Sequence, residues 1–261
     1  MVIGDVVRSM TANSIIGLIR DRLQNNNEES MNVIGLLGLP GAGKTTASEA
    51  LVEYGESVEG IQMKQVAKEC YDKVNEDGLD GFSDDFQARI EDDPTAEDTF
   101  CVTGNFGEEI GDWVDNVLNV DGTYFATRAV QKAQESTQDV CVVDGIRSEA
   151  DAKTFTEEAD NCVFYFLHCP FETRLKRLQD RGREGEEDFQ ANDLLDRDRQ
   201  ELSWGLRQIL SDYQYTADQT NYESVYSIEY IPAMNHDSIE AFQEEVCVHF
   251  STTVADWGVD C

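Results

Sequence analysis

The chain has 261 residues, of which 40% are hydrophobic, and its three Trp, nine Tyr and twelve Phe indicate a folded protein with one good core. Its 53 Asp and Glu outnumber 20 Lys and Arg and give a formal net charge of −33, a field that excludes nucleic acid and anionic membranes as general partners. Because the sequence has no run of 18 or more apolar residues and no basic start followed by an apolar stretch, we expect no transmembrane helix, no signal peptide and a cytoplasmic location.

The first thirty residues are predicted to be an appendage. Residues 5–23 have the apolar spacing of a helix and end in the polar linker QNNNEES. Met31 then begins a strand pattern, which makes it a candidate start of the chain. The N-terminal helix is one of two segments that could bind a protein partner; the other is an acidic insertion at 78–122.

From Met31 onward, strands alternate with helices. The predicted strands are 33–37, 57–63, 139–145, 162–168 and 225–231, and the helices between them include 47–54, 147–159, 171–182 and 238–250. DVCVVDG and CVFYFLH are nearly continuous apolar runs, typical of parallel strands that are covered on both faces. This rhythm predicts an α/β fold with a five-stranded parallel sheet and helices on both faces. We divide the core into 31–77, 123–170 and 213–261, interrupted by the helical insertion at 78–122 and by an arginine-rich segment at 171–212.

After the first core strand comes GLPGAGKT, residues 38–45, which fits the pattern G-x-x-x-x-G-K-[ST] between a strand and a helix. Its glycines permit positive φ, so backbone N–H groups can approach phosphate, and the helix N-terminus favours an anion. Lys44 is predicted to reach the β- and γ-phosphates of ATP, and Thr45 to offer its hydroxyl to Mg²⁺. The predicted nucleotide-binding residues are Gly38, Pro40, Gly41, Ala42, Gly43, Lys44, Thr45 and Thr46. The motif predicts a P-loop NTPase.

The third predicted strand ends in Asp144, within VCVVDGIRSEAD. P-loop proteins keep a carboxylate for Mg²⁺ or its waters at such a strand end. Since the carboxyl ends of neighbouring parallel strands form one crevice, we expect Asp144 to share an edge with the glycine-rich loop. Arg147, three residues further, is predicted to reach a phosphate of the second substrate. The alternatives are a turn or helix-capping role for Asp144 and a surface charge for Arg147.

Arginines gather after the fourth strand. Seven of the thirteen fall within 174–207, namely Arg174, Arg177, Arg181, Arg183, Arg197, Arg199 and Arg207. A helix, a polar loop and a second helix, with arginines at the inner ends, predict a lid in which Arg181 and Arg183 neutralise charge on the transferred phosphoryl group. The alternative is a solvated, salt-bridged hairpin, which explains Arg207 and Arg174 better than it explains Arg181 and Arg183.

The cysteines and the charge pattern indicate the redox state and the salt concentration in which the protein works. The chain has an odd number of cysteines and no C-x-x-C pair, which favours buried reduced thiols over disulfides or a zinc site. The seven cysteines are Cys70, Cys101, Cys141, Cys162, Cys169, Cys247 and Cys261. The three histidines, His168, His236 and His249, have no ligand spacing. The acidic residues are spread along the chain, which fits adaptation to high salt, where the Debye length falls to about 3 Å at about 1 M. The alternative is an ordinary acidic protein.

These motifs together resemble an archaeal family of P-loop nucleotide-kinase-like proteins, related to adenylate kinase and often described as dephospho-CoA kinase-like. The resemblance covers roughly 80% of the chain and is carried by VIGLLGLPGAGKTT, NFGEEIGDWV, RAVQKAQ, VVDGIRSEAD, HCPFETRLKRLQDRGR and LDRDRQELSWGL, in that order. It implies a five-stranded parallel core, a lid and a small helical lobe for the phosphoryl acceptor, which is where the insertion falls. The sequence departs from the family after the second strand, where Gln65 and Lys68 replace an Asp and an Arg, and Lys68 keeps the charge without the bidentate geometry.

The favoured function is a kinase that transfers the γ-phosphoryl group of ATP to a small phosphate-bearing acceptor, a nucleoside monophosphate or a dephospho-CoA-like nucleotide. Lys44, Arg147, Arg181 and Arg183 are its predicted catalytic residues, and Thr45 and Asp144 its predicted Mg²⁺ ligands. The alternative is a non-kinase NTPase that serves as a nucleotide-dependent interaction module, although no glutamate stands out to activate water. A kinase for a non-nucleotide metabolite such as a sugar acid is the third possibility.

Overall fold

The structure is a computed structural model that describes residues 30–101, 106–181, 189–211, 226–232 and 238–259. The chain divides into two units, Met1–Ser30 and Met31–Cys261, and the fold below is that of the second unit. The predicted helix at 5–23 and the predicted lid residue Arg183 lie outside the described residues.

A five-stranded parallel sheet forms the centre of this unit. Its strands are β1 (Asn32–Leu37), β2 (Val58–Gln62), β3 (Val140–Asp144), β4 (Asn161–His168) and β5 (Ile228–Pro232), in the order β2-β3-β1-β4-β5. All residues of β1 are buried, because it pairs with β3 and β4 and is covered on both faces. The predicted α/β fold with a five-stranded parallel sheet is confirmed, and the last strand lies slightly later in the chain than predicted.

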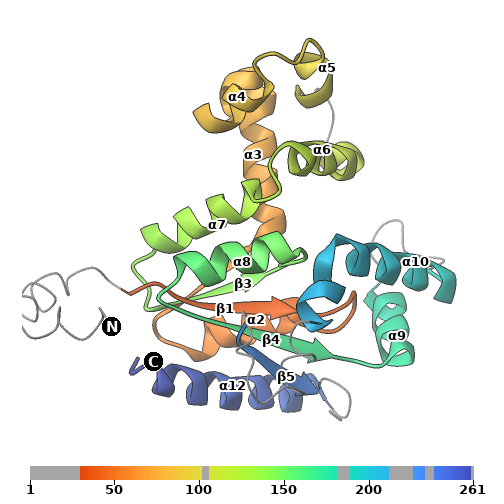
Figure 1. The fold of residues 1–261 in the computed structure, drawn as a ribbon. Helices are drawn as coiled ribbons and strands as arrows, with labels where there is room; N and C mark the ends of the chain where they lie inside the picture. Colours follow the sequence, from red (N-terminus) through yellow and green to blue (C-terminus); the bar gives the residue numbers. More distant parts are fainter. Residues whose placement is uncertain (1–29, 102–105, 182–188, 212–225, 233–237, 260–261) are drawn as a thin grey trace, which may run out of the picture. The chain divides into compact units, whose positions relative to one another are not determined.

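Helices cover both faces of the sheet (Figure 1). The helices α2 (Lys44–Tyr54) and α12 (Ile239–Asp256) pack on one face, and α7 (Tyr124–Glu135) and α8 (Glu149–Glu158) lie on the other. Alternate residues of β1 divide between the two layers: Ile34 and Leu36 join the core under α2 and α12, while Val33 and Leu37 join the opposite core. In the described part of the chain, no helix is long and apolar enough to cross a membrane.

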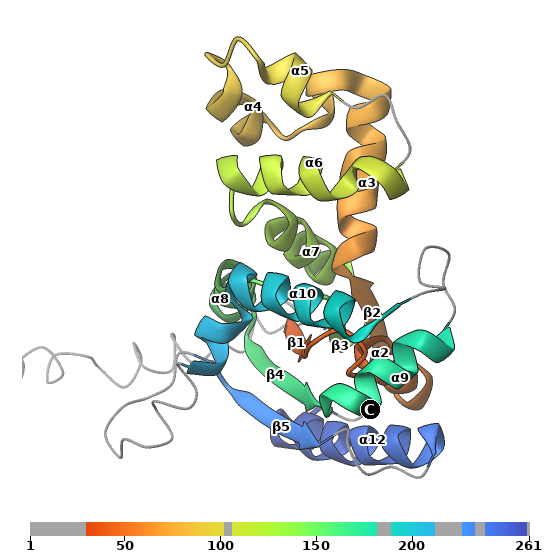
Figure 2. The ribbon, with the colours of Figure 1, turned by 90° about the vertical axis from the view of Figure 1, so that its right-hand side faces the viewer.

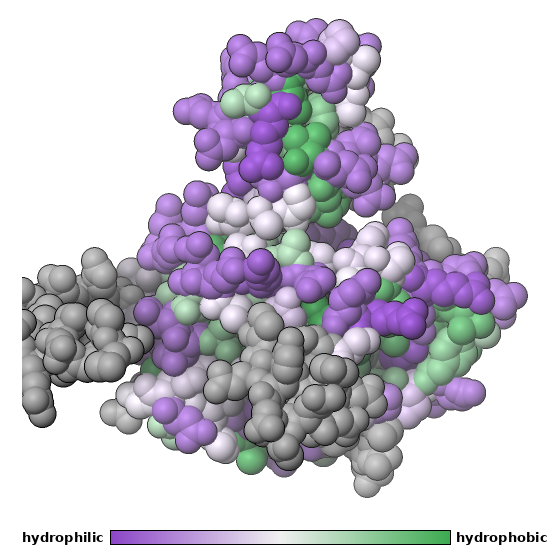
Figure 3. All heavy atoms as spheres, viewed as in Figure 1, coloured by the Kyte–Doolittle hydropathy of each residue, from purple (hydrophilic) through white to green (hydrophobic). Residues whose placement is uncertain are grey.

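A helical lobe rises from the end of β2 (Figure 2). It consists of α3 (Met63–Asp77), the short 3₁₀ helix η1 (Gly78–Gly81), α4 (Asp84–Ile90), α5 (Ala96–Phe100) and α6 (Phe106–Val120). Its interior is aromatic: Phe82 stacks on Phe86 with ring centroids 4.3 Å apart, and Trp113 Nε1 donates a hydrogen bond of 3.0 Å to the Phe100 carbonyl. Hydrophilic side chains cover most of the lobe face seen in Figure 3. The apolar interior of the lobe is continuous with the core on one face of the sheet.

A second helical element lies where the strand arrows of Figure 1 end. It contains α9 (Phe171–Arg181), α10 (Ala191–Glu201) and a kinked turn, η2 (Leu202–Leu206). Leu178, Phe189 and Leu194 form its small apolar cluster. This α9–α10 hairpin occupies the position predicted for the arginine-rich segment.

The cysteines within the described ranges are free thiols: Cys70, Cys101, Cys141, Cys162, Cys169 and Cys247. Burial raises the pKa of Cys141 to about 11 and that of Cys162 to about 12, so both stay protonated at neutral pH. Cys261 and His236 lie outside these ranges. No group of three or more His, Cys, Asp or Glu side chains in the described part is arranged to hold a metal ion.

Candidate functional site

The glycine-rich loop joins β1 to α2 and has the backbone conformation that its sequence predicts. Gly41 and Gly43 have φ values of +79° and +104°, in the left-handed region that favours glycine. A Cβ atom on Gly41 would lie 3.0 Å from the Arg174 carbonyl oxygen of α9, so the loop also needs glycine for close packing. Ala42 N donates to the Leu39 carbonyl at 3.1 Å and closes the turn. The loop is thus fixed by its own backbone and by the hairpin behind it.

Lys44 is the first residue of α2, earlier than the predicted start of that helix at residue 47. Its ammonium group donates to the carbonyls of Gly38, at 2.5 Å, and Leu39, at 3.4 Å, and so lies along the inside of the loop. Burial lowers the pKa of Lys44, while the charges of Glu201 and Asp144 oppose this effect. The ammonium group is therefore a desolvated cation held by weak acceptors that a phosphate oxygen could replace.

Thr45 and Asp144 meet at the carboxyl edge of the sheet. The Thr45 hydroxyl donates to Asp144 Oδ2 at 2.9 Å, although 99 positions separate the two in the sequence. The contact arises because β1 and β3 are neighbours, with Leu36 opposite Asp144 in the parallel register. A hydroxyl and a carboxylate are hard oxygen donors of the kind that Mg²⁺ accepts, so the residues present fit this ion. Thr46 follows on α2 next to this pair.

Arg147 follows β3 and lies beside a carboxylate that the sequence did not single out. Gly145, with a φ of +97°, turns the chain against Met63, and Arg147 then points its Nε to within 3.9 Å of Glu201 Oε1. The Arg147 side chain is 46% exposed and that of Glu201 only 12%. The Arg147 guanidinium also lies 5.2 Å from the ring centroid of Trp204. The structure thus brings Arg147 to the site and adds Glu201 to it.

Two arginines of α9, Arg174 and Arg177, contact other groups of the protein, including the glycine-rich loop. Arg174 is buried and makes two hydrogen bonds of 2.7 Å with the carboxylate of Asp198 on α10. It also donates to the carbonyls of Pro40, at 3.0 Å, and Cys169, at 3.1 Å. Arg177 contacts the loop from outside, with Nη1 3.5 Å from the Ala42 carbonyl oxygen. The salt-bridged interpretation is therefore the one that fits Arg174, which fastens the hairpin to the loop.

The other described arginines of the hairpin differ in exposure and in partners. Arg181 ends α9 and its side chain is exposed. Arg199 forms an exposed ion pair with Asp196 at 2.7 Å, and the Arg197 guanidinium lies 4.6 Å from the centroid of the Phe189 ring. Arg207 is exposed as well. The described hairpin therefore places Arg174 and Arg177 on the loop, and the lid roles of Arg181 and Arg183 remain predictions.

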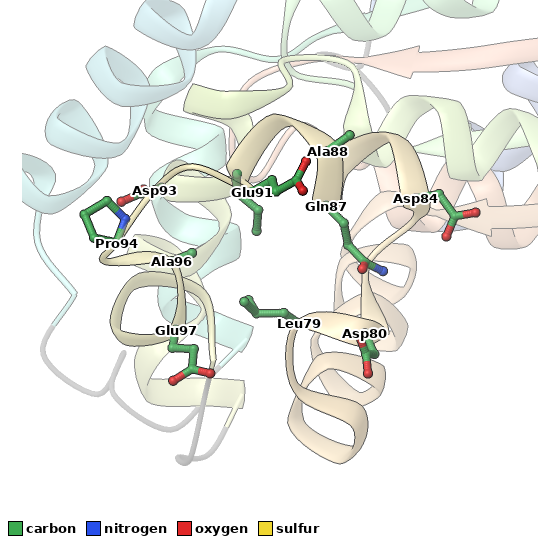
Figure 4. Close-up of a pocket in the computed structure, with 11 residues that line it drawn as sticks. Leu79, Asp80, Asp84, Gln87, Ala88, Glu91, Asp93, Pro94, Ala96 and Glu97 are labelled. Atoms are coloured by element: carbon green, nitrogen blue, oxygen red, sulfur yellow. The ribbon is translucent and has the colours of Figure 1, made fainter.

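A cavity of about 660 Å³ lies at the tip of the helical lobe, between η1, α4 and α5 (Figure 4). Its lining carries carboxylates and no basic side chain; the acidic members are Asp80, Asp84, Glu91, Asp93 and Glu97. Such a lining disfavours a phosphate-bearing ligand. A smaller cavity, of about 160 Å³, adjoins the glycine-rich loop and is lined by Leu39, Ala42, Phe166, His168, Phe171 and Arg174, among others. Lys44, Thr45, Asp144 and Arg147 line neither of these two cavities.

Comparison with known proteins shows the family to which the chain belongs. A family model described as AAA domain matches residues 34–196, which include the loop, Asp144 and the first turns of α10. A UPF0200 protein of Methanoculleus marisnigri is 27% identical over 180 residues, covering 69% of this chain and 82% of the relative. A UPF0200/UPF0201 protein of Archaeoglobus fulgidus is 30% identical over 193 residues, covering 73% of this chain and 51% of the relative. The expected relation to an archaeal P-loop family is confirmed.

Among solved structures, TT1252 from Thermus thermophilus is similar, with a TM-score of 0.49 and 12% sequence identity. The alignment covers 85% of this chain and 98% of that structure.

Proposed function

The chain belongs to the family described as AAA domain, and on this premise we propose that it is an ATP-dependent phosphotransferase. It would transfer the γ-phosphoryl group of ATP to a small phosphate-bearing acceptor, a nucleoside monophosphate or a dephospho-CoA-like nucleotide. The observation that carries the proposal is the hydrogen bond of 2.9 Å between Thr45 and Asp144, next to the ammonium group of Lys44. It joins two oxygen donors that would hold Mg²⁺ to a loop that would bind phosphate, at one edge of the sheet.

Each group at this edge has a role that its chemistry supports. The backbone N–H groups of the loop and the start of α2 would bind the β- and γ-phosphates, and Lys44 would exchange its carbonyl partners for phosphate oxygens. Thr45 and Asp144 would hold Mg²⁺, which when bound neutralises charge on the β- and γ-phosphate oxygens. Arg147 would bind a phosphate of the acceptor or the transferred group. Arg181 and Arg183 are proposed to add charge from the hairpin when ATP is bound.

The acceptor would bind between the core and the helical lobe, where α3 leaves β2. The two residues that depart from the expected family pattern have partners on α3 itself: Lys68 pairs with Asp72, and Gln65 Nε2 lies 3.3 Å from Glu69 Oε1. A phosphate that approached Lys68 would compete with Asp72 for its ammonium group. This contact favours an acceptor whose phosphate binds mainly through Arg147.

The test is a panel of acceptors incubated with ATP and Mg²⁺ in concentrated KCl, with phosphoryl transfer followed by nucleotide separation. Turnover of one nucleotide acceptor well above plain ATP hydrolysis supports the proposal, and no gain with any acceptor refutes it. Lys44→Ala should abolish turnover while circular dichroism shows an intact fold. Retained activity in that variant would overturn the assignment of the loop.

The alternative, a nucleotide-dependent interaction module, predicts a different pattern. ATP hydrolysis would be slow, unaffected by nucleotide acceptors and stimulated by a protein partner that binds residues 1–30 or the acidic insertion. The same hydrolysis assay, repeated with a partner obtained by pull-down, separates the two functions. A metabolite kinase would instead respond to a non-nucleotide acceptor in the panel.

A further inference from the structure

Glu201 lies at the candidate site without a role in the proposed transfer. It is the last residue of α10, and its carboxylate is almost covered, with 12% of the side chain exposed. Its nearest cation is Arg147, with Nε and Oε1 3.9 Å apart. Burial lowers the pKa of Lys44, and the charges of Glu201 and Asp144 both oppose that effect. One carboxylate from the hairpin thus faces the two cations that would meet a polyphosphate.

The backbone that follows Glu201 packs against the segment that follows Arg147, and this packing positions Glu201 beside Arg147. The chain passes from α10 directly into Leu202–Leu206, where it kinks at Gly205, whose φ of 133° and ψ of −6° are not helical. A Cβ atom on Gly205 would lie 2.7 Å from Glu149 N and 3.1 Å from Ser148 Cα. The turn therefore packs directly on the backbone that follows Arg147. Trp204 adds its ring beside the Arg147 guanidinium, so two side chains of this segment contact the same arginine.

We propose that Glu201 is a further residue of the nucleotide site, an internal carboxylate that holds Arg147 beside the loop and competes with the incoming polyphosphate for Arg147 and Lys44. This inference rests on the proposed function, because it assumes that a polyphosphate binds at the loop. Binding is then an exchange of anions. The Glu201 carboxylate attracts both Arg147 and Lys44, and the ligand must displace part of that interaction. The ligand must also approach a chain of net charge −33.

The test compares Glu201→Gln with Asp196→Asn. Both variants remove one negative charge from α10, but Asp196 pairs with the exposed Arg199 and lies outside the site. Calorimetry with inorganic tripolyphosphate and with ATP, both without Mg²⁺, measures the affinity of the anion alone. Because a like charge near the ligand is removed, Glu201→Gln should bind both probes about three- to tenfold more tightly than the wild-type protein, and Asp196→Asn should bind them as the wild type does.

Coupling to Arg147 gives the second readout. In an Arg147→Gln background, the gain from Glu201→Gln should fall to less than half, because only Lys44 then remains opposite residue 201. An equal gain in both backgrounds would overturn the role in holding Arg147. If Glu201→Gln does not fold, Glu201→Asp, which draws the charge back by one methylene, should show a smaller gain in affinity, and wild-type affinity in that variant would overturn the competition.

The outcomes distinguish a failure of the Glu201 inference from a failure of the proposed phosphotransferase function. A wild-type protein that binds neither probe refutes the proposed function and the inference with it. A wild-type protein that binds both probes, together with a Glu201→Gln variant of equal or weaker affinity, refutes the inference alone. A gain of the same size in Asp196→Asn would show that net charge is responsible and would also refute it.

Discussion

Asp198→Asn removes the charge that pairs with the guanidinium group of Arg174. That guanidinium is buried, with 4% of the Arg174 side chain exposed, and it makes four hydrogen bonds in the structure. Two of them, each of 2.7 Å, go to the carboxylate of Asp198, and the others reach the carbonyls of Cys169 and Pro40. The variant keeps the shape of the side chain but turns one acceptor into a donor and leaves the cation uncompensated.

The magnitude follows from the loss of a buried partner. Breaking a buried ion pair by removing one side costs about 3–5 kcal/mol, and we expect Asp198→Asn to fall in that range. For a unit of this size, such a loss lowers Tm by roughly 6–20 °C. Urea unfolding with an unchanged m-value measures it. The control is Asp196→Asn on the same helix, whose pair with Arg199 has side chains 74% and 73% exposed. The control should cost less than about 0.5 kcal/mol.

Two outcomes would contradict this reasoning. A cost below about 1 kcal/mol for Asp198→Asn would mean that water reaches the guanidinium group in the folded protein. Replacing both partners, as Arg174→Met with Asp198→Leu, should cost less than Asp198→Asn alone, because no charge is then left buried. A double variant less stable than the single one would reject the ion pair as the source of the effect.

Three further changes test other parts of the structure. Gly205→Ala should destabilise the protein by about 2 kcal/mol or more, because the new Cβ atom would lie 2.7 Å from Glu149 N at a φ of +133°; Gly111→Ala in α6, where nothing lies within 4 Å, should be neutral or stabilising in the same thermal scan. Arg183→Lys, tested by kinetics with the identified acceptor, should slow transfer at least about tenfold with little change in ATP affinity, and an unchanged kcat would show that the lid prediction is wrong. Tm should rise as KCl is increased to about 2 M, since screening relieves repulsion among the acidic residues, and a flat curve rejects salt adaptation.

The fold and the two sequence motifs were accessible from the sequence for a clear physical reason. Buried parallel strands leave continuous apolar runs, and GLPGAGKT carries its own turn geometry in Gly41 and Gly43. Asp144 could be paired with Thr45 because strand ends share one edge in a parallel sheet, and the structure brings the two side chains together at 2.9 Å. In each case the signal is local in the sequence.

Glu201 had no such signal. It is one of 53 acidic residues, and it reaches Arg147 only because the hairpin folds back and the turn at Gly205 packs on Ser148. The sequence also did not show which arginines of α9 are buried and which are exposed. Arg174 and Arg181 are seven residues apart and lie on the same face of α9. Asp198 from α10 pairs with Arg174, which is buried, whereas Arg181 is exposed. Both differences come from tertiary packing between segments, which the pattern of one helix does not encode.

The same packing indicates which cations a ligand can reach. Arg174 makes two hydrogen bonds of 2.7 Å to Asp198 and two more to backbone carbonyls, so a phosphate would gain nothing from it that Asp198 does not already supply. Arg147 is 46% exposed and 3.9 Å from its carboxylate, and Lys44 is held by two carbonyls, so both can exchange partners. In concentrated salt, where charges act over only about 3 Å, the net charge of −33 no longer repels a polyphosphate from a distance. Affinity then depends on direct contacts, and the strength with which the protein holds these two cations sets how readily they bind phosphate.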